Sequence, residues 1–316
     1  MIGKVVYKDS SLKSKYNWEG IRKMKNPFIS FSVAMVTPFS TNGNLYLEGI
    51  PSLVNYYKKH KVPALLISGT TGEQHSMTVE ERMALFHKVK KEAKNDLIIY
   101  GGVAAVQTND AIALAITAEK VGLDGIMLGF PPYLRINQQE AFNYVSKICS
   151  VTHLPIMIYN NPPRTGFDLH VETLIQLVET FPQVVAFKEA GDVSSVPIVK
   201  KKLGPEFIVL SGSDTNIFED AELGYNGITS ILGNVFPEEI HDIIKNLQAG
   251  DKEKGQNRFS KLLPYMHSII EMGTLRTIKY LLEKRNIQVG ICREPLSTLN
   301  IEEKHIIDKF FSVIIK

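Results

Sequence analysis

The chain is organised around the stretch Val184-Val185-Ala186-Phe187-Lys188-Glu189-Ala190-Gly191-Asp192, in which an apolar, β-branched run ends in one lysine and a glycine-containing turn follows. A short run of this kind is typical of a buried strand. An amine at the end of such a strand is poorly solvated, which disfavours its ammonium form and leaves a free amine that can attack a carbonyl. Lys188 is therefore a candidate Schiff-base nucleophile. The alternative is a solvated lysine just past a strand.

Similar short runs recur along the whole chain and alternate with longer amphipathic segments. Strands are expected at 29–36, 64–68, 97–100, 125–128, 155–159, 184–187, 207–210 and 227–231. Helical patterns lie between them, for example at 78–94, 110–121, 138–150 and 170–180. Eight strands that are each followed by a helix predict a parallel sheet closed into a (β/α)8 TIM barrel.

The other parallel architecture is a doubly wound open sheet. It typically carries a GxGxxG or GxxxxGK[ST] loop after an early strand, and this sequence has neither. After a predicted eighth helix at 238–249, three more helical patterns follow at 252–272, 274–283 and 301–315. The predicted organisation is an N-terminal extension (1–26), a barrel carrying the active site (27–250) and a C-terminal helical region packed on the barrel (251–316).

Composition excludes several classes of function. Hydrophobic content of 44% and charged content of 22% are those of a soluble globular protein. A formal charge of +3 gives no sign of a nucleic-acid or membrane partner. No apolar run approaches the roughly 20 residues that span a bilayer, and residues 1–26 lack the apolar core of a signal peptide. Cys149 and Cys292 have no CxxC spacing and are expected to be reduced thiols of a cytoplasmic protein.

Unusual residue clusters fall repeatedly at the predicted carboxyl ends of the strands, where barrels of this type carry their chemistry. They are 69–73, 130–133, 159–166, Lys188, 211–214 and 229–230. Each cluster alone could be turn chemistry, because Gly, Pro, Asn and Ser are the residues that turns need. Their convergence on one rim indicates an active site.

Five side chains in these clusters have both a structural and a chemical interpretation. Thr70 and Thr71 lie between glycines and either form a helix-entry turn or hold a small carboxylate. Tyr159 is either a core aromatic or a proton shuttle beside the lysine. Arg164 is either a solvated surface residue or a bidentate carboxylate ligand. Glu73 is either a structural cap or a catalytic acid.

The histidines do not suggest a metal site. His60, His75 and His87 have no metal-ligand spacing with Asp or Glu. We therefore expect no zinc.

The clusters resemble the dihydrodipicolinate synthase and N-acetylneuraminate lyase family of pyruvate-dependent class I aldolases. The resemblance runs from about Pro27 to the C-terminus and rests on residues 69–73, 159–166, 187–190 and 211–214. It implies that Lys188 forms an imine with pyruvate. It also implies that Tyr159 is the adjacent general acid and base, relaying protons with Thr70.

The same resemblance implies the binding residues. Thr71 and the main chain around Thr229 would hold the pyruvate carboxylate, and Arg164 would face the carboxylate of the second substrate. Tyr133 is a further candidate substrate-binding residue. It is followed by Leu134, where the synthases usually have a second tyrosine that completes a proton relay across a subunit interface. Thr229 replaces a residue that is often aliphatic, which we expect to make the carboxylate end of the pocket more polar.

The resemblance implies a Schiff-base carbon–carbon lyase or synthase that condenses pyruvate with aspartate semialdehyde. The alternative is a 2-oxo-acid aldolase or dehydratase acting on 2-oxo-3-deoxy sugar acids or 4-hydroxy-2-oxo acids. Members are usually tetramers built from dimers, so a homotetramer or homodimer is expected, with no metal or organic cofactor. Two non-enzymatic hypotheses are a keto-acid-binding protein on the same barrel and a scaffold that acts through residues 1–26.

Overall fold

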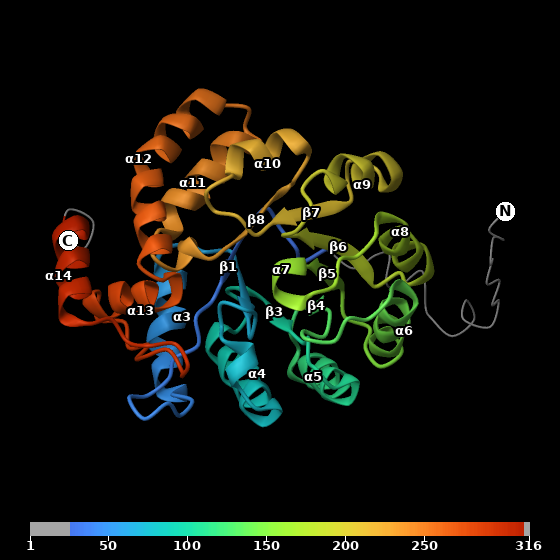
Figure 1. The fold of residues 1–316 in the computed structure, drawn as a ribbon, viewed down its shortest axis with the longest axis horizontal. Coiled ribbons are helices and arrows are strands. Elements are labelled where there is room, and N and C mark those ends of the chain that lie inside the picture. Colours follow the sequence, from blue (N-terminus) through green and yellow to red (C-terminus); the bar gives the residue numbers. More distant parts are fainter. Residues whose placement is uncertain (1–25, 313–316) are drawn as a thin grey trace.

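The computed structural model describes residues 26–312, in which eight short apolar strands close into one parallel barrel (Figure 1). The strands are β1 (Phe31–Ala34), β2 (Ala64–Ile67), β3 (Ile98–Gly102), β4 (Gly125–Gly129), β5 (Ile156–Asn160), β6 (Val184–Glu189), β7 (Ile208–Ser211) and β8 (Gly227–Ser230). Each strand pairs with the next in parallel, and β8 pairs with β1. The (β/α)8 prediction is confirmed, and all eight strands lie at the predicted positions.

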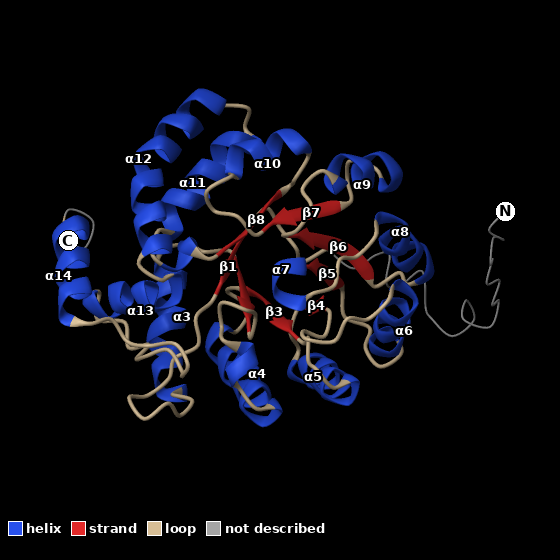
Figure 2. Cartoon of the chain, viewed as in Figure 1, coloured by secondary structure: helices blue, strands red, loops and turns tan. Residues whose placement is uncertain are grey.

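Helices surround the barrel and connect its strands (Figure 2). They are α3 (Ile50–Lys59), α4 (Val79–Ala93), α5 (Thr108–Val121), α6 (Gln138–Cys149), α8 (Val171–Thr180), α9 (Ser195–Leu203), α10 (Ile217–Leu223) and α11 (Pro237–Gln248). A short helix, α7 (Pro162–Thr165), follows β5 in a stretch expected to be an irregular loop. Its two prolines occupy the first helical positions, where the missing N–H groups have no intrahelical partner in any helix.

Three further helices form the C-terminal region: α12 (Lys252–Glu271), α13 (Thr274–Lys284) and α14 (Ile301–Phe311). Helix α12 packs against α11, and α13 lies beside α3 (Figure 1). Arg285, just after α13, donates hydrogen bonds to the Tyr56 hydroxyl of α3 and to the Val235 carbonyl after β8. The helices predicted at 252–272 and 274–283 are confirmed, and the one predicted at 301–315 is confirmed over 301–311. Residues 313–316 lie outside the described residues. Residues 1–25 lie outside the described residues, so the predicted extension has no structural account.

Local sequence signals explain where the helices begin. The Thr78 hydroxyl accepts a hydrogen bond from the Glu81 N–H at 3.2 Å, and the Glu81 carboxylate accepts one from the Thr78 N–H at 2.9 Å. This capping box, expected from the Thr-x-x-Glu spacing, satisfies backbone donors that a helix start leaves free. Helices α6 and α14 begin with the same reciprocal pair. None of the helices between residues 26 and 312 is long and apolar enough to cross a membrane.

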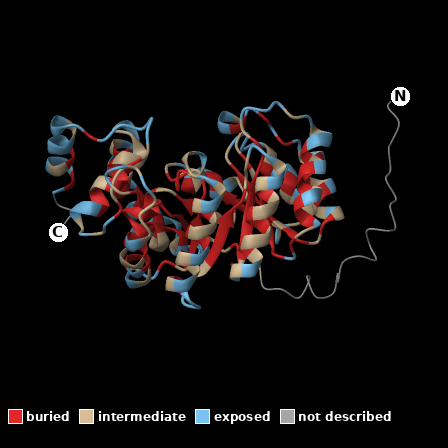
Figure 3. Cartoon of the chain, turned by 90° about the horizontal axis from the view of Figure 1, so that it is seen from below, coloured by how far each residue is buried: buried red, intermediate tan, exposed pale blue. Residues whose placement is uncertain are grey.

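Two apolar cores hold the barrel together. Inside it, side chains from alternate strand positions pack around Leu66, Tyr100, Met127, Met157 and Leu210. A larger core fills the layer between the strands and the helices, which expose their outer faces (Figure 3). Because a packed interior leaves no channel, the open space for a ligand lies at the end of the barrel.

We predict that Gly102→Ala destabilises the protein, because Gly102 ends β3 where the chain leaves no room for a side chain. A Cβ at this position would overlap the carbonyl group of Ser68, a backbone group that cannot move independently. The free energy of unfolding, measured by urea denaturation, should fall by at least about 2 kcal/mol. The control is Gly129→Ala at the end of β4, where the nearest atom is 3.4 Å away, on the Tyr159 ring. Equal effects of the two substitutions would contradict the prediction.

Candidate active site

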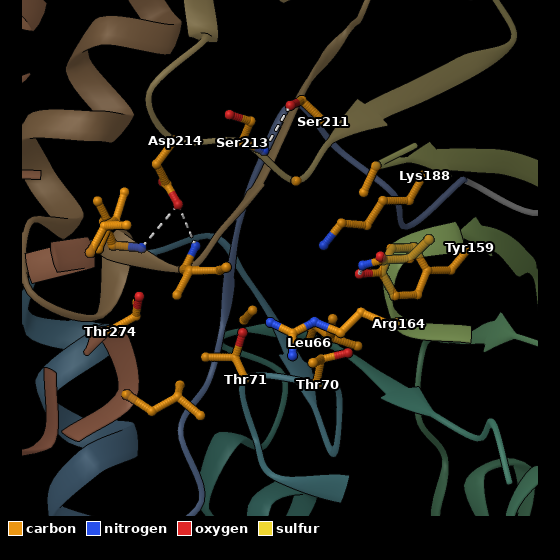
Figure 4. A pocket seen from close by; sticks show the side chains of 18 of the residues that line it. Leu66, Thr70, Thr71, Tyr159, Arg164, Lys188, Ser211, Ser213, Asp214 and Thr274 are labelled. Carbon is orange, nitrogen blue, oxygen red and sulfur yellow. Dashed lines mark hydrogen bonds between the residues drawn. The ribbon is translucent and has the colours of Figure 1, made fainter. Parts of the chain in front are cut away.

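A cavity of about 870 Å³ opens at the carboxyl ends of the strands. Its barrel side is built from the ends of β2, β5, β6 and β7, and its other side from the C-terminal region near Thr274 and Leu296. Figure 4 shows Lys188, Tyr159, Arg164 and the threonines on the barrel side, with Asp214 and Thr274 across from them. The cavity is therefore walled by the barrel and the C-terminal helices together.

Lys188 is the central side chain of this cavity and is 5% exposed. Backbone pairing places it directly opposite Tyr159, on the neighbouring strand β5. The Lys188 Nζ lies 5.0 Å from the centre of the Tyr159 ring. Gly212 is close enough that a Cβ there would lie 3.0 Å from the Lys188 Cε and 3.5 Å from its Nζ. The glycine thus gives the amine the space that it occupies at the cavity wall.

The electrostatic surroundings favour a neutral amine. Burial lowers the pKa of Lys188 from 10.5 to about 8, and the negative charge of Asp214 opposes this shift. Burial also raises the pKa of Asp214, which its hydrogen-bond donors and Lys188 counteract. At pH values above about 8 the amine is mostly unprotonated and can act as a nucleophile.

Tyr159 presents its hydroxyl between neighbouring polar groups. The Asn161 side-chain amide donates a hydrogen bond to it. Burial raises the pKa of Tyr159, and hydrogen bonds with Asn161 and Thr70 and the charge of Arg164 partly offset this rise. A phenol with a raised pKa is protonated at neutral pH, so it can donate a proton and recover it through a neighbour.

The turn after β2 brings Thr70 and Thr71 to the cavity. Ser68 and Glu73, which flank the turn, both have left-handed backbone conformations, with φ of 54° and 55°. The Glu73 N–H donates to the Thr70 carbonyl at 3.0 Å, which closes the turn. Thr71 is nearly buried and Thr70 is partly exposed. The turn therefore places both threonines at the cavity wall, where hydroxyl groups can donate to a small carboxylate.

The structure brings five of the predicted site residues together at the cavity: Lys188, Tyr159, Thr70, Thr71 and Arg164. Arg164 reaches it from α7, and Figure 4 shows its guanidinium near Thr70. Two of the predicted site residues, Tyr133 and Thr229, do not line this cavity. Tyr133 is 95% exposed, on the loop after β4, and Leu134 beside it is also exposed.

Thr229 does not line the cavity either. Its hydroxyl lies inside the barrel, 3.1 Å from the hydroxyls of Ser32 and Tyr100, which are themselves 2.6 Å apart. The expectation that Thr229 makes the carboxylate end of the pocket more polar is therefore wrong, because its hydroxyl is used in this interior cluster. The main chain around Thr229 contributes through Ile231 and Leu232, which do line the cavity.

Sequence reasoning gave no role to the three buried carboxylates that line the cavity, which are Asp214, Glu189 and Asp220. Asp214 accepts hydrogen bonds from the Ile231 N–H at 2.9 Å and the Leu232 N–H at 3.1 Å, so it fixes the loop after β8 (Figure 4). Glu189, next to Lys188, accepts from Asn160 at 3.0 Å, and burial raises its pKa to about 7. The positions of Glu189 and Asp214 at or just after the ends of strands could have indicated that they lie near the cavity. Their hydrogen-bond partners could not be predicted, because these lie on other elements.

The open question about Glu73 is answered by its contacts. Its carboxylate is fully buried, and its Oε1 lies 2.6 Å from the Nζ of Lys279 on α13. Its Oε2 accepts a hydrogen bond from the Arg293 N–H at 2.9 Å. Glu73 does not line the cavity, which favours the structural interpretation over a catalytic acid.

A (β/α)8 barrel with a buried lysine at the end of a strand is the arrangement of an enzyme of the lyase class, of the class I aldolase type. Residues 27–313 match the family model described as the dihydrodipicolinate synthetase family. The chain belongs to this family.

Similar proteins agree with this assignment. A 4-hydroxy-tetrahydrodipicolinate synthase of Bacillus subtilis is 32% identical over 278 residues, which cover 88% of this chain and 96% of that protein. The crystal structure of a dihydrodipicolinate synthase from Bacillus anthracis has a TM-score of 0.84 at 31% identity, covering 91% of this chain and 98% of the other. The enzyme from Aquifex aeolicus has a TM-score of 0.86 at 26% identity, with 90% and 98% covered.

We predict that the amine of Lys188 titrates near pH 8. Its rate of acetylation by trace acetic anhydride, followed by mass spectrometry, should rise with pH and level off above that value, because only the neutral amine reacts. Asp214→Asn should move the inflection to lower pH, since it removes the charge that favours the ammonium form. Lys284 is the internal reference, because its hydrogen bond with Asp308 raises its pKa. Equal inflections for Lys188 and Lys284 would contradict the prediction.

Proposed function

We propose that this protein is a Schiff-base enzyme that condenses pyruvate with aspartate semialdehyde, the reaction of 4-hydroxy-tetrahydrodipicolinate synthase. The observation that carries this proposal is the buried Lys188 amine with a lowered pKa. It lies on β6 directly opposite Tyr159 of β5, with its Nζ 5.0 Å from the centre of the Tyr159 ring. The similarity to synthases over most of the chain supports the same reaction.

The first stage of the reaction uses the amine as a nucleophile. The neutral Lys188 nitrogen attacks the ketone carbon of pyruvate, and loss of water from the adduct gives an iminium ion. Tyr159 supplies the proton that the departing oxygen needs and recovers it through Thr70. The hydroxyl and N–H groups around Thr71 bind the pyruvate carboxylate.

The second stage forms the carbon–carbon bond. The iminium draws electrons from the adjoining methyl group, which loses a proton and becomes an enamine. The enamine carbon attacks the aldehyde carbon, and the aldehyde oxygen takes up a proton. The amino group of the semialdehyde then attacks the iminium carbon. The Lys188 amine leaves, and loss of a proton from the ring nitrogen gives the cyclic imine product. We propose that no metal or organic cofactor takes part, because the iminium nitrogen accepts the charge that a Lewis acid would otherwise take.

Arg164 provides the recognition of the second substrate in this proposal. It lies at the cavity wall on the short helix α7, directly after the two prolines that begin this helix. No ion pair of Arg164 with an acidic side chain is found between residues 26 and 312, so its charge is available to a carboxylate. Aspartate semialdehyde carries such a carboxylate beyond its aldehyde carbon.

A second candidate is cleavage or dehydration of 2-oxo-3-deoxy sugar acids. Two observations favour it: Leu134 occupies the place of the second tyrosine, and the wall formed by Ser213, Thr215, Asn216 and Ser297 is rich in hydroxyl and amide groups. Such groups suit a polyhydroxylated tail. Rates with aspartate semialdehyde and with a 2-oxo-3-deoxy sugar acid distinguish the two reactions.

We also infer self-association and a cytoplasmic location. Tyr133, Leu134 and Val106 are exposed apolar side chains on the loops after β3 and β4. Burial of these side chains against a second copy would remove apolar surface from water. A homodimer or homotetramer, as is usual in the family, would place Tyr133 in an interface near the site. Sedimentation measurements test this inference.

We predict that pyruvate becomes covalently attached to Lys188. Treatment with pyruvate and borohydride should add the mass of pyruvate less one oxygen atom, and peptide mapping should locate it on Lys188. Lys188→Arg keeps the charge but cannot form the imine, so it should remain unmodified. An unmodified wild-type protein, or the same adduct in Lys188→Arg, would overturn the proposed function.

We predict that Arg164→Ala impairs use of the second substrate and spares the first. With aspartate semialdehyde, kcat/KM should fall by a factor equivalent to at least about 2 kcal/mol, since a charged partner of the substrate carboxylate is lost. Trapping of the pyruvate imine should remain near the wild-type level. Arg258→Ala is the matched control, because this exposed arginine of α12 pairs with Asp242. If the protein cleaves or dehydrates a 2-oxo-3-deoxy sugar acid faster than it condenses aspartate semialdehyde, the second candidate is favoured.

A further inference from the structure

One carboxylate connects the turn after β2 to two separate points of the C-terminal region. Glu73 follows Thr70 and Thr71, and its buried carboxylate contacts the Lys279 Nζ at 2.6 Å and the Arg293 N–H at 2.9 Å. Arg293 lies 220 residues further along the chain. The turn that presents the two hydroxyls to the cavity is therefore held from outside the barrel.

The segment that Glu73 contacts, residues 289–297, is here named the C-terminal strap. The strap pairs with Phe39 through two backbone hydrogen bonds. The Phe39 N–H donates to the Val289 carbonyl at 3.1 Å, and the Ile291 N–H donates to the Phe39 carbonyl at 3.2 Å. The Arg293 guanidinium forms an ion pair with Glu81 in the first turn of α4. Residues 295–297 then line the cavity itself. The strap thus runs from the base of the Thr70-Thr71 turn to the opposite wall of the same cavity.

Lys279 makes this connection depend on the charge of Glu73. Its ammonium is almost fully buried, donates a hydrogen bond to the Ile291 carbonyl at 2.6 Å and lies 4.6 Å from the centre of the Phe39 ring. Burial lowers the pKa of Lys279, and Glu73 opposes that shift. An ammonium this deeply buried requires an anionic partner, and Glu73 is the carboxylate in contact with it.

The backbone of the turn explains why it needs an external restraint. Ser68 and Glu73 are both non-glycine residues with left-handed conformations, which are sterically unfavourable and persist where the surroundings impose them. The Glu73 side chain supplies such a restraint at one end of the turn. At the other end, Arg82 donates a hydrogen bond to the Ser68 hydroxyl at 2.8 Å.

We propose that Glu73 is a positioning residue: through Lys279 and Arg293 it holds the Thr70-Thr71 turn in the conformation that receives the pyruvate carboxylate. This inference rests on the proposed function, which assigns that carboxylate to the turn. Because Glu73 does not line the cavity, it acts on substrate through the turn and leaves the reacting atoms to Lys188 and Tyr159.

The test compares pyruvate affinity with the reaction at saturation in Glu73→Gln. Glutamine places an oxygen at one of the two carboxylate positions and an NH2 donor at the other, so it loses the acceptor that faces either Lys279 or Arg293. The pyruvate concentration for half-maximal borohydride trapping should rise at least about five-fold, while trapping at saturation stays within about two-fold. The pH dependence of trapping should not change, because the surroundings of Lys188 are intact. Lys284→Gln, which breaks an exposed ion pair of α13 with Asp308, is the control and should leave both values unchanged.

A double variant separates positioning from loss of stability. Glu73→Gln alone leaves the Lys279 charge buried without a partner and should lower the melting temperature. Glu73→Gln with Lys279→Met removes both charges and should restore much of the melting temperature, because no unpaired ion remains. The raised half-maximal pyruvate concentration should persist, since the tie to α13 is still absent. Its return to the wild-type value together with the melting temperature would overturn the inference and leave a purely structural role.

The outcomes also distinguish the inference from the function on which it rests. Absence of a pyruvate adduct in the wild-type protein would remove the proposed function. A wild-type adduct on Lys188, with a half-maximal pyruvate concentration in Glu73→Gln within about two-fold of wild type, would overturn the positioning role alone.

Discussion

The removal of one amine from water is the constraint on which the site depends. Lys188 is held at the end of β6, where burial lowers its pKa to about 8 and the Asp214 carboxylate limits the fall. Gly212 leaves room for the amine, and pairing of β5 with β6 brings Tyr159 next to it. A pKa near 8 suits both halves of the reaction. Attack on the ketone needs the neutral amine, and departure of the amine from the product needs its protonated form.

The cavity belongs to two regions of the chain that are remote in sequence. The barrel supplies the amine, the phenol and the hydroxyl turn, and the C-terminal region supplies the facing wall near Thr274 and Leu296. The buried Glu73–Lys279 ion pair joins the two regions beside this cavity. The C-terminal helices are therefore part of the site, which a barrel ending after β8 and α11 would leave open on one side.

The strands and most helices could be predicted because their signals are local: apolar β-branched runs, amphipathic repeats and the Thr78 capping box. Lys188 and Tyr159 could be placed at the rim because both end predicted strands. The helix α7 was missed because its two prolines also suit a loop. Three other features depend on residues far apart in sequence: the hydrogen bond from the Leu232 N–H to Asp214, the ion pair of Glu73 with Lys279, and the inward orientation of Thr229. Periodicity along one chain cannot reveal such pairs.

The hydroxyls of Ser32, Tyr100 and Thr229 have a consequence for how the family can vary. They form a triangle within hydrogen-bonding distance inside the barrel, where water has no access to replace a missing member. An aliphatic residue at one corner would leave the other two with unmet hydrogen-bonding capacity. We therefore expect these three positions to be inherited as a set, so that relatives with an aliphatic residue in place of Thr229 also differ at the other two.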